Sequence, residues 1–428
     1  MDGAVAVVRE PELIAPMSPS RRLRGMSRRD FLRLGAFGAA AIGLGACSPA
    51  TPSSASPSAV ASGPPADEPS EAAGTASPTA PAVPSASSGP SLRQKVAGLV
   101  IVGFRGAALD DVGWLRTALV DEGLGGVILF DRDGETGRDR NIISPKQVSR
   151  LVRDLRATAG KRRILVAIDQ EGGVVTRLSP AHGFPPLASE ASVGKGSAAE
   201  AKAWARGLAE TLATAGIDLN LAPVVDLNVN RSNPAIGKLG RSFSADPDVV
   251  VEMATIEIEA HRAAGVLTTL KHFPGIGSAT KNTDVGAADV TKTWTRAELE
   301  PFRRLIASGE ADLIMAGHVF NGQLDPQLPA SLSPAVVTDL LRGELGWDGV
   351  VVTDDLQAAA IDEAFGRDEA IVLALAAGND LLLFANQQSY DRSIVTDVVD
   401  VVVHAIDEGR LDESRVGDAW DRVQRLIS

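Results

Sequence analysis

The sequence has few of the residues that build disulfides and metal clusters. It contains one cysteine, Cys47, and five histidines in 428 residues, and no two of the histidines have the spacing of metal ligands. A single cysteine excludes an internal disulfide framework and a cysteine-cluster metal site. We therefore expect no metal. We also expect no cofactor, because there is no P-loop and no G-x-G-x-x-G motif after the first predicted strand.

Positive charge is also scarce. The 42 Lys and Arg residues stand against 54 Asp and Glu, for a formal net charge of −12. This balance argues against nucleic acid as a partner, because phosphate backbones attract basic surfaces. Residues 1–47 are the exception, with seven arginines and four acidic residues. A basic N-terminal segment of this kind is typical of export signals.

Three signals follow one another in residues 1–47. S-R-R-D-F-L at residues 27–32 resembles the twin-arginine signal pattern, and residues 34–46 are uncharged and rich in Gly and Ala. That apolar run is too short to span a bilayer, which takes roughly 20 residues. L-G-A-C at residues 44–47 resembles the lipobox, which implies a lipid anchor on Cys47 at the outer face of the cytoplasmic membrane. The alternative is that Cys47 is a small buried residue.

Residues 48–90 have the composition of a linker. Of these 43 residues, 32 are Ser, Pro or Ala, and none is aromatic, basic, Leu, Ile or Met. Such a segment cannot bury enough apolar surface to offset the entropy of ordering it. We therefore predict a disordered spacer between the signal segment, 1–47, and a folded domain at residues 91–428.

Residues 91–428 alternate between apolar segments of strand length and amphipathic segments of helix length. The periodicity predicts helices over residues 198–215, 246–264 and 296–308, among others. Apolar strands that alternate with helices are typical of a parallel sheet covered on both faces. Eight such units predict an α/β fold, a single (β/α)8 TIM barrel, better than an open doubly wound sheet. The predicted strands are residues 96–104, 126–130, 164–169, 217–226, 266–273, 313–319, 350–354 and 381–384.

Polar residues gather where these strands end. A barrel carries its active site at the C-terminal ends of its strands, so these side chains are expected to converge. Some of the aspartates, such as Asp355, could instead cap a following helix. Helix capping does not explain Lys271 and His272, because cations at a helix N-terminus oppose its dipole. Carboxylates with hydrogen-bonding groups on a barrel rim favour glycoside hydrolysis. The strand-end residues are Asp169, Gln170, Glu171, Asp226, Lys271, His272, His318, Asp354 and Asp355.

Five motifs in one order resemble family-3 glycoside hydrolases. I-D-Q-E-G-G at residues 168–173, followed by Arg177, and L-A-P-V-V-D at residues 221–226 are similar to two neighbouring strands of that family. G-R-S-F, K-H-F-P-G and V-T-D, which begin at positions 240, 271 and 352, match three further motifs. Each motif is weak on its own, but five in sequence across residues 91–428 are strong. Because a second domain is missing, the chain resembles the bacterial single-domain β-N-acetylglucosaminidases, which trim cell-wall muropeptide fragments.

The resemblance implies a role for each matched residue. Asp354 would be the nucleophile of a retaining exo-glycosidase that releases terminal β-linked N-acetylglucosamine through a covalent glycosyl-enzyme. The implied partners are a carbohydrate substrate and the lipid anchor, and we expect a monomer. His318 has a weaker claim, since a structural histidine with hydrogen-bonded ring nitrogens would explain it as well. The residues that would hold the sugar hydroxyls and N-acetyl group are Asp169, Arg177, Arg241, Lys271 and His272.

One loop departs from the family pattern. In the family an Asp-His pair after K-H-F-P-G supplies the general acid/base, but here Asp284 stands at the histidine position and Asn282 at the position of the orienting aspartate. In a first interpretation Asp284 is the acid/base, with a pKa raised by burial or by Asp354. In a second the loop has lost its acid, and in a third Asp284 is only a turn residue. We favour the first, because the replacement is itself a carboxylate.

Two other functions stay open at this point. One is a β-glucosidase-type exoglycosidase without N-acetyl preference. The other is a catalytically weak, sugar-binding lipoprotein, because losing general acid catalysis typically costs about 10²–10⁴-fold in rate.

Overall fold

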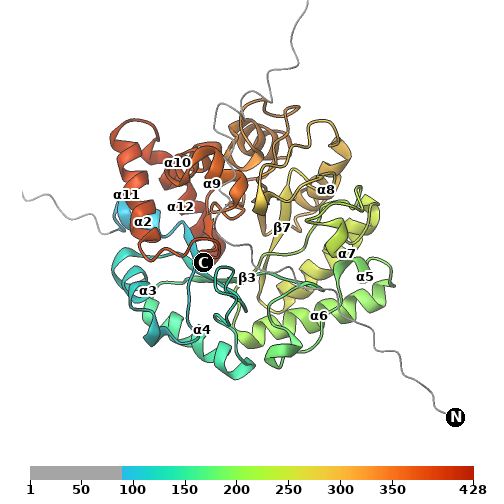
Figure 1. The fold of residues 1–428 in the computed structure, drawn as a ribbon, viewed down its shortest axis with the longest axis horizontal. Helices are drawn as coiled ribbons and strands as arrows, with labels where there is room; N and C mark the ends of the chain where they lie inside the picture. Colours follow the sequence, from blue (N-terminus) through green and yellow to red (C-terminus); the bar gives the residue numbers. More distant parts are fainter. Residues whose placement is uncertain (1–88) are drawn as a thin grey trace, which may run out of the picture. The chain divides into compact units, whose positions relative to one another are not determined.

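The structure is a computed structural model that describes residues 89–428 (Figure 1). The expectations for the signal segment, for Cys47 and for nearly all of the 48–90 linker fall outside the described residues, and they stay predictions.

Eight parallel strands form the barrel of the described domain. They are hydrogen-bonded in the order β10-β1-β2-β3-β6-β7-β8-β9, and a parallel bridge between Val352 and Leu381 joins the two ends of this sheet. The predicted α/β fold, a (β/α)8 barrel, is therefore confirmed. The strands are β1 (Val100–Gly103), β2 (Gly126–Leu129), β3 (Leu165–Ile168), β6 (Leu219–Asn220), β7 (Leu267–Phe273), β8 (Leu313–Ala316), β9 (Val350–Thr353) and β10 (Leu382–Phe384).

Helices surround the barrel strands, as Figure 1 shows for α3, α4, α6, α7, α8 and α10. The α-helices are α2 (Leu92–Ala97), α3 (Gly113–Thr117), α4 (Pro145–Ala159), α5 (Glu190–Val193), α6 (Ala198–Ala215), α7 (Pro247–Ala263), α8 (Glu300–Ala307), α9 (Ala359–Phe365), α10 (Arg367–Ala377), α11 (Ile394–Asp407) and α12 (Glu413–Ile427). Short 3-10 or π-helical segments are η1 (Leu109–Asp111), η2 (Ala118–Glu122), η3 (Pro180–His182), η4 (Gly237–Leu239), η5 (Thr283–Val285), η6 (Arg296–Leu299), η7 (Ala330–Leu332) and η8 (Ala335–Glu344). A small hairpin, β4 (Gln170–Gly172) with β5 (Val175–Thr176), follows β3.

All eight predicted strands contain a strand of the structure, within narrower bounds. The predicted strand at 96–104 begins too early, because residues 96 and 97 complete α2, whose capping box at Ser91 starts a helix. The predicted strand at 217–226 pairs regularly only over β6, since Pro223 has no N–H to donate to a neighbouring strand. Helix α6 has the predicted bounds, from a capping box at Ser197 to Gly216 in the left-handed region.

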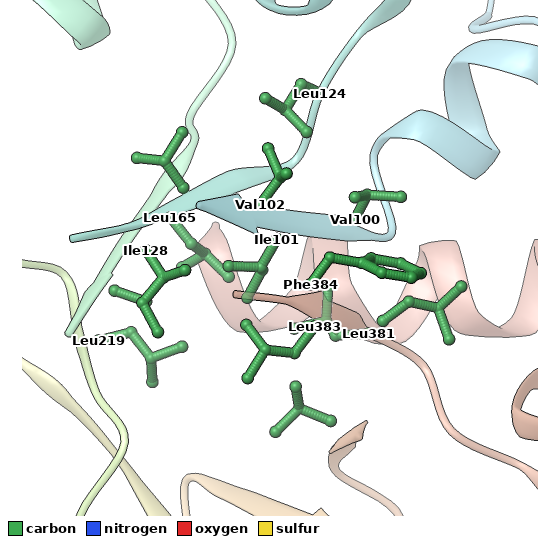
Figure 2. Close-up of a cluster of buried hydrophobic side chains, with 14 of the residues drawn as sticks. Val100, Ile101, Val102, Leu124, Ile128, Leu165, Leu219, Leu381, Leu383 and Phe384 are labelled. Carbon is green, nitrogen blue, oxygen red and sulfur yellow. The ribbon is translucent and has the colours of Figure 1, made fainter. Parts of the chain in front are cut away.

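The strand register places large apolar side chains on the inner face of the barrel. Ile101 pairs with Leu383 of β10 on one side and with Gly126 of β2 on the other, and Ile128 lies two residues further along β2. Figure 2 shows Ile101, Ile128, Leu219 and Leu383 directed into one shared space, and all four are at most 3% exposed. Side chains of one face thus fill the barrel, and only its ends are open to ligands.

The described chain enters the barrel at the N-terminal ends of the strands. Pro90 lines a cavity together with Gly125 and Arg163, which precede β2 and β3. Among residues 89–428, no helix is both long enough and apolar enough to cross a membrane.

A buried aspartate ties the closing strands together. Asp380, which is fully buried just before β10, accepts the N–H of Val351 at 3.0 Å and Nη2 of Arg342 at 2.7 Å. Its other oxygen accepts Nη2 of Arg415 at 2.8 Å. One carboxylate therefore joins β9, β10 and two helical segments that cover them.

We expect Asp380→Ala to lower the free energy of unfolding by about 3–5 kcal/mol, because it leaves two largely buried guanidinium groups without their anion. Urea unfolding followed by circular dichroism would measure the change. Asp348→Ala is the matched control, since Asp348 is 85% exposed and reaches only Arg422, so its change should stay within about 0.5 kcal/mol. Equal effects of the two substitutions would contradict this account of barrel closure.

Candidate active site

A polar pocket opens at the C-terminal ends of the strands, with a cavity volume of about 280 Å³. It brings together all seven catalytic and sugar-binding residues predicted from the sequence, although these come from different strands and loops. Those residues are Asp169, Arg177, Arg241, Lys271, His272, Asp284 and Asp354.

Glu171 is the centre of a buried ion-pair network under the pocket. Its carboxylate accepts Nε and Nη2 of Arg241 at 2.7 and 2.8 Å and lies 2.6 Å from Nζ of Lys271. Nζ of Lys271 also donates to Asp169 at 2.8 Å. Burial alone would raise the pKa of Glu171, but the charges of Arg241 and Lys271 hold it well below its usual range. From the sequence, Glu171 was predicted only as a strand-end residue and not as the centre of an ion-pair network.

His272 is oriented by an aspartate behind the pocket. Nδ1 of His272 donates to Oδ2 of Asp226 at 2.7 Å, and the backbone N–H of His272 donates to the same oxygen at 3.1 Å. Oδ1 of Asp226 accepts the N–H of Ile276 at 2.7 Å. Asp226 therefore fixes the ring of His272 and the start of the following loop.

Arg177 directly follows β5 and lines the pocket. Its guanidinium carbon lies 5.3 Å from the ring centre of Phe130, and Nη1 is 3.6 Å from Asp131. Its buried Nε has no hydrogen-bond partner among residues 89–428. Buried polar groups are normally paired, so this N–H is suited to an acceptor on a ligand.

Asp354 follows β9 and faces the pocket. Its Oδ1 accepts the N–H of Asp355 at 2.9 Å, and its own N–H donates to Ala316. Burial would raise the pKa of Asp354, but the neighbouring His318 and His272 and the N–H of Asp355 together lower it. The group is thus kept as a carboxylate, the form in which it can attack carbon.

Asp284 lies in η5, on the loop that follows β7. The side chain of Asn282 accepts the N–H of Asp284 at 3.1 Å. Asp284 lines the pocket, although the residue as a whole is exposed to solvent. Burial and then the negative charge of Asp354 raise the pKa of Asp284.

Asp355, a strand-end residue for which helix capping was the alternative explanation, also lines the pocket. The explanation that it caps a helix is wrong, because α9 starts at Ala359 with Ala358 as its cap. Instead Oδ1 of Asp355 accepts the N–H groups of Gln357 and Ala385, at 3.1 and 3.0 Å. Burial, with smaller contributions from nearby anions, raises the pKa of Asp355 to about 7.

Two further pocket residues, Gln387 and Gln388, were missed. Both come shortly after β10, so the strand-end rule that selected the aspartates could have found them. Polar uncharged side chains carry a weaker signal than carboxylates, and this is why they were passed over.

His318 is a structural residue. Its Nε2 donates to the carbonyl of Asp355 at 2.8 Å, its Nδ1 accepts the hydroxyl of Ser331 at 2.7 Å, and only 2% of the residue is exposed. Burial lowers the pKa of His318. The interpretation of His318 as a hydrogen-bonded structural histidine agrees with these contacts.

The described residues contain no group of three or more His, Cys, Asp or Glu side chains placed to hold a metal ion. Carboxylates of opposite pKa shift, cations and amide groups converge instead at the open end of a (β/α)8 barrel. Fold and site together define the class of barrel-type glycoside hydrolases.

Comparison with known proteins agrees with this class. The Glycosyl hydrolase family 3 N terminal domain matches residues 91–426. A β-hexosaminidase of Stenotrophomonas maltophilia is 35% identical over 308 residues, which cover 69% of this chain and 86% of the relative. One of Tolumonas auensis is 37% identical over 274 residues, or 62% of this chain and 77% of the relative.

Solved structures give the same result. A family 3 β-N-acetylglucosaminidase from Paenibacillus superposes with a TM-score of 0.71 at 35% identity, over 79% of this chain and 62% of that one. A β-N-acetylhexosaminidase from Beutenbergia cavernae also has a TM-score of 0.71, at 34% identity, over 79% of this chain and 99% of that one. The chain belongs to family 3 of the glycoside hydrolases, which confirms the resemblance, and it is a glycoside hydrolase.

We expect Glu171→Gln to lower the free energy of unfolding by about 3–5 kcal/mol and to weaken sugar binding, because two cations lose their shared anion. Since the pKa of Glu171 is lowered, its stabilisation is present above its unfolded pKa and is lost only as the pH falls through the folded pKa. Urea unfolding at pH 7 and calorimetric binding of N-acetylglucosamine would measure both effects. Glu300→Gln, which removes only a surface pair with Arg303, should leave both unchanged, and equal effects of the two variants would refute the assignment.

Proposed function

We propose that this protein is a retaining exo-glycosidase that releases terminal β-linked N-acetylglucosamine from cell-wall muropeptides or related glycans. The observation that carries the proposal is that Asp354 and Asp284, in one pocket, have pKa values shifted in opposite directions. A carboxyl whose ionised form is favoured, beside one whose protonated form is favoured, is the division of roles that glycoside hydrolysis needs. The similarity of the chain to β-hexosaminidases and to a β-N-acetylhexosaminidase supports the preference for N-acetylhexosamine.

Asp354 acts as the nucleophile in this proposal. An oxygen of its carboxylate forms a bond to the anomeric carbon while the bond from that carbon to the leaving oxygen breaks. The leaving oxygen takes a proton from Asp284. Water then attacks the anomeric carbon, Asp284 accepts its proton, and the sugar leaves Asp354.

The charged residues under the pocket hold the sugar. Lys271 and Arg241 present donors, Asp169 presents acceptor oxygens, and a polyol offers partners for both. The unpaired Nε of Arg177 adds a donor at the side of the pocket. His272 turns its ring toward the cavity while Asp226 holds Nδ1, so Nε2 is available to the ligand.

Two carboxyls compete for the role of acid, because Asp284 and Asp355 both line the pocket with raised pKa values. Geometry favours Asp284. No backbone N–H of residues 89–428 donates to the Asp284 carboxyl, whereas Oδ1 of Asp355 is held by two backbone N–H groups. The first interpretation of the loop, with Asp284 as acid/base, is therefore the one we propose.

We further propose that the enzyme is anchored by a lipid on Cys47 and works as a monomer on the outer face of the cytoplasmic membrane. The twin-arginine and lipobox resemblances support this location. In the described domain the chain enters at the barrel end opposite the pocket. A tether attached there would leave the pocket free to meet cell-wall fragments.

Asp354→Asn should lower kcat by on the order of 10⁶-fold, as for other groups that form covalent intermediates. Incubation with a 2-fluoro glycoside, followed by mass spectrometry of peptides, should place the sugar on Asp354 in the wild type and nowhere in the variant. Asp362→Asn, an exposed change on α9, is the control and should behave as wild type. Label on any other residue would overturn the assignment of the nucleophile.

Asp284→Asn should slow cleavage of N-acetylglucosaminyl oligosaccharides about 10²–10⁴-fold and leave the first-turnover release of 4-nitrophenol from 4-nitrophenyl glycosides nearly unaffected, because an activated leaving group needs no proton in the first step. Product analysis on both substrates would measure this ratio. Asp355→Asn is the matched comparison and should lower both activities alike if Asp355 only positions the loop after β9. A selective loss in Asp355→Asn, with none in Asp284→Asn, would transfer the acid role to Asp355.

A further inference from the structure

The loop that carries Asp284 rests on a second buried carboxyl, which the proposed mechanism does not use. Glu298, in η6, is 1% exposed, and its Oε2 accepts the N–H of Ser278 at 3.2 Å. Ser278 lies at the base of the loop, six residues before Asp284. Oε1 of Glu298 has no hydrogen-bond partner among residues 89–428.

Two glycines let the loop backbone pack directly against Glu298. A Cβ on Gly275 would lie 2.7 Å from Cβ of Glu298, closer than carbon atoms can approach. A Cβ on Gly277 would lie 3.3 Å from Oε2 of Glu298 and 1.8 Å from the carbonyl oxygen of Leu227. The base of the loop is thus fitted to this carboxyl.

A neighbouring carboxylate holds the same stretch from the other side. Asp226 accepts the N–H of Ile276 and orients His272, so Asp226 and Glu298 bind alternate residues of one segment. The side chain of Asn230 adds a bond to the carbonyl of Ala279. Further along, the tip is held by the local Asn282 turn, by contact of η5 with α9, and by a long bond of 3.4 Å from Gln388.

We propose that Glu298 is a positioning residue for general acid catalysis, whose carboxyl fixes the base of the loop and so places Asp284 at the leaving oxygen. The inference rests on the proposed function and deepens it. This loop makes several hydrogen bonds at its base and few at its tip, so the contacts at the base determine where the tip, with Asp284, lies. Loss of the Ser278 bond would therefore move Asp284 without touching Asp354 or the sugar-binding residues.

The same contact makes the loop sensitive to pH. Burial, with the charge of Asp226 adding to it, raises the pKa of Glu298 to about 7. Asp226 is the charged group that faces Glu298 from the strand side, with His272 paired behind it, and Arg296 of η6 is directed to Glu344 at the surface. A raised pKa means that the native state favours neutral Glu298, so this stabilisation is complete at low pH and is lost as the pH rises through about 7. Ionisation then places a second anion beside Asp226, beneath the loop.

The test compares Glu298→Ala, which removes the acceptor for Ser278, with Glu298→Gln, which keeps an acceptor oxygen and the side-chain volume. Each is assayed at pH 6 on an N-acetylglucosaminyl oligosaccharide and on its 4-nitrophenyl glycoside, and the activity on the aryl glycoside is taken throughout as the first-turnover release of 4-nitrophenol, which needs no general acid. We expect Glu298→Ala to lose about 10²-fold on the oligosaccharide, the lower end of the general-acid contribution, and less than about threefold on the aryl glycoside. Glu298→Gln should restore the oligosaccharide activity.

The second readout holds even if Glu298→Ala does not fold. In the wild type the ratio of oligosaccharide to aryl-glycoside turnover should fall as the pH rises through about 7, and in Glu298→Gln it should hold to higher pH. Identical pH profiles in the two proteins, or equal losses on both substrates in Glu298→Ala, would overturn the proposal.

The variant Asp284→Asn distinguishes a failure of the Glu298 proposal from a failure of the proposed glycosidase function. If Asp284→Asn keeps its selective loss on the oligosaccharide while the Glu298 variants behave as wild type, the acid assignment stands and the role of Glu298 falls. If the wild type cleaves neither substrate, the proposed function itself falls.

Discussion

The ion pair network around Glu171 is the constraint on which the pocket depends. It connects the hairpin after β3, the loop after β6 and the end of β7, so three sides of the cavity share one buried anion. The two cations, Arg241 and Lys271, are balanced by Glu171 and Asp169. Burial raises the pKa values of the nearby Glu190 and Glu257 and so favours their neutral forms, which add no charge to this balance. A buried charge network is tolerated only when its charges are matched in this way.

This balance decides what the remaining carboxyls can do. The cations under the sugar site, Arg241 and Lys271, are already paired with other carboxylates. The pKa of Asp354 is therefore lowered mainly by the two histidines and by the N–H of Asp355. Burial raises the pKa values of Asp284 and Asp355, and the negative charge of Asp354 adds to the effect on both. One ionised carboxylate thereby divides the roles of the two carboxyls around it.

The fold could be predicted from the sequence because apolar runs of strand length mark all eight strands, whatever their exact ends. The irregular part, residues 217–226, was overestimated because burial around Pro223 gives an apolar pattern without regular pairing. In the site, Asp169, Lys271 and Asp354 follow strands and were found by that rule, whereas Arg241 and Asp284 lie on loops and needed the family motifs. Glu298 had no signal, because it acts through the backbone of Ser278, and such contacts leave no residue pattern.

Asp284 stands where the family pattern has a histidine, and this difference is consistent with the electrostatic arrangement of the pocket. The negative field of Asp354 favours the protonated form of any group at position 284, whether that group is an imidazole or a carboxyl. A charged aspartate at position 282 would help a histidine by stabilising its cation, but a carboxylic acid needs no cation partner. Asn282 supplies the turn through its hydrogen bond to the N–H of Asp284 and adds no charge. The two departures from the family pattern thus form one consistent pair.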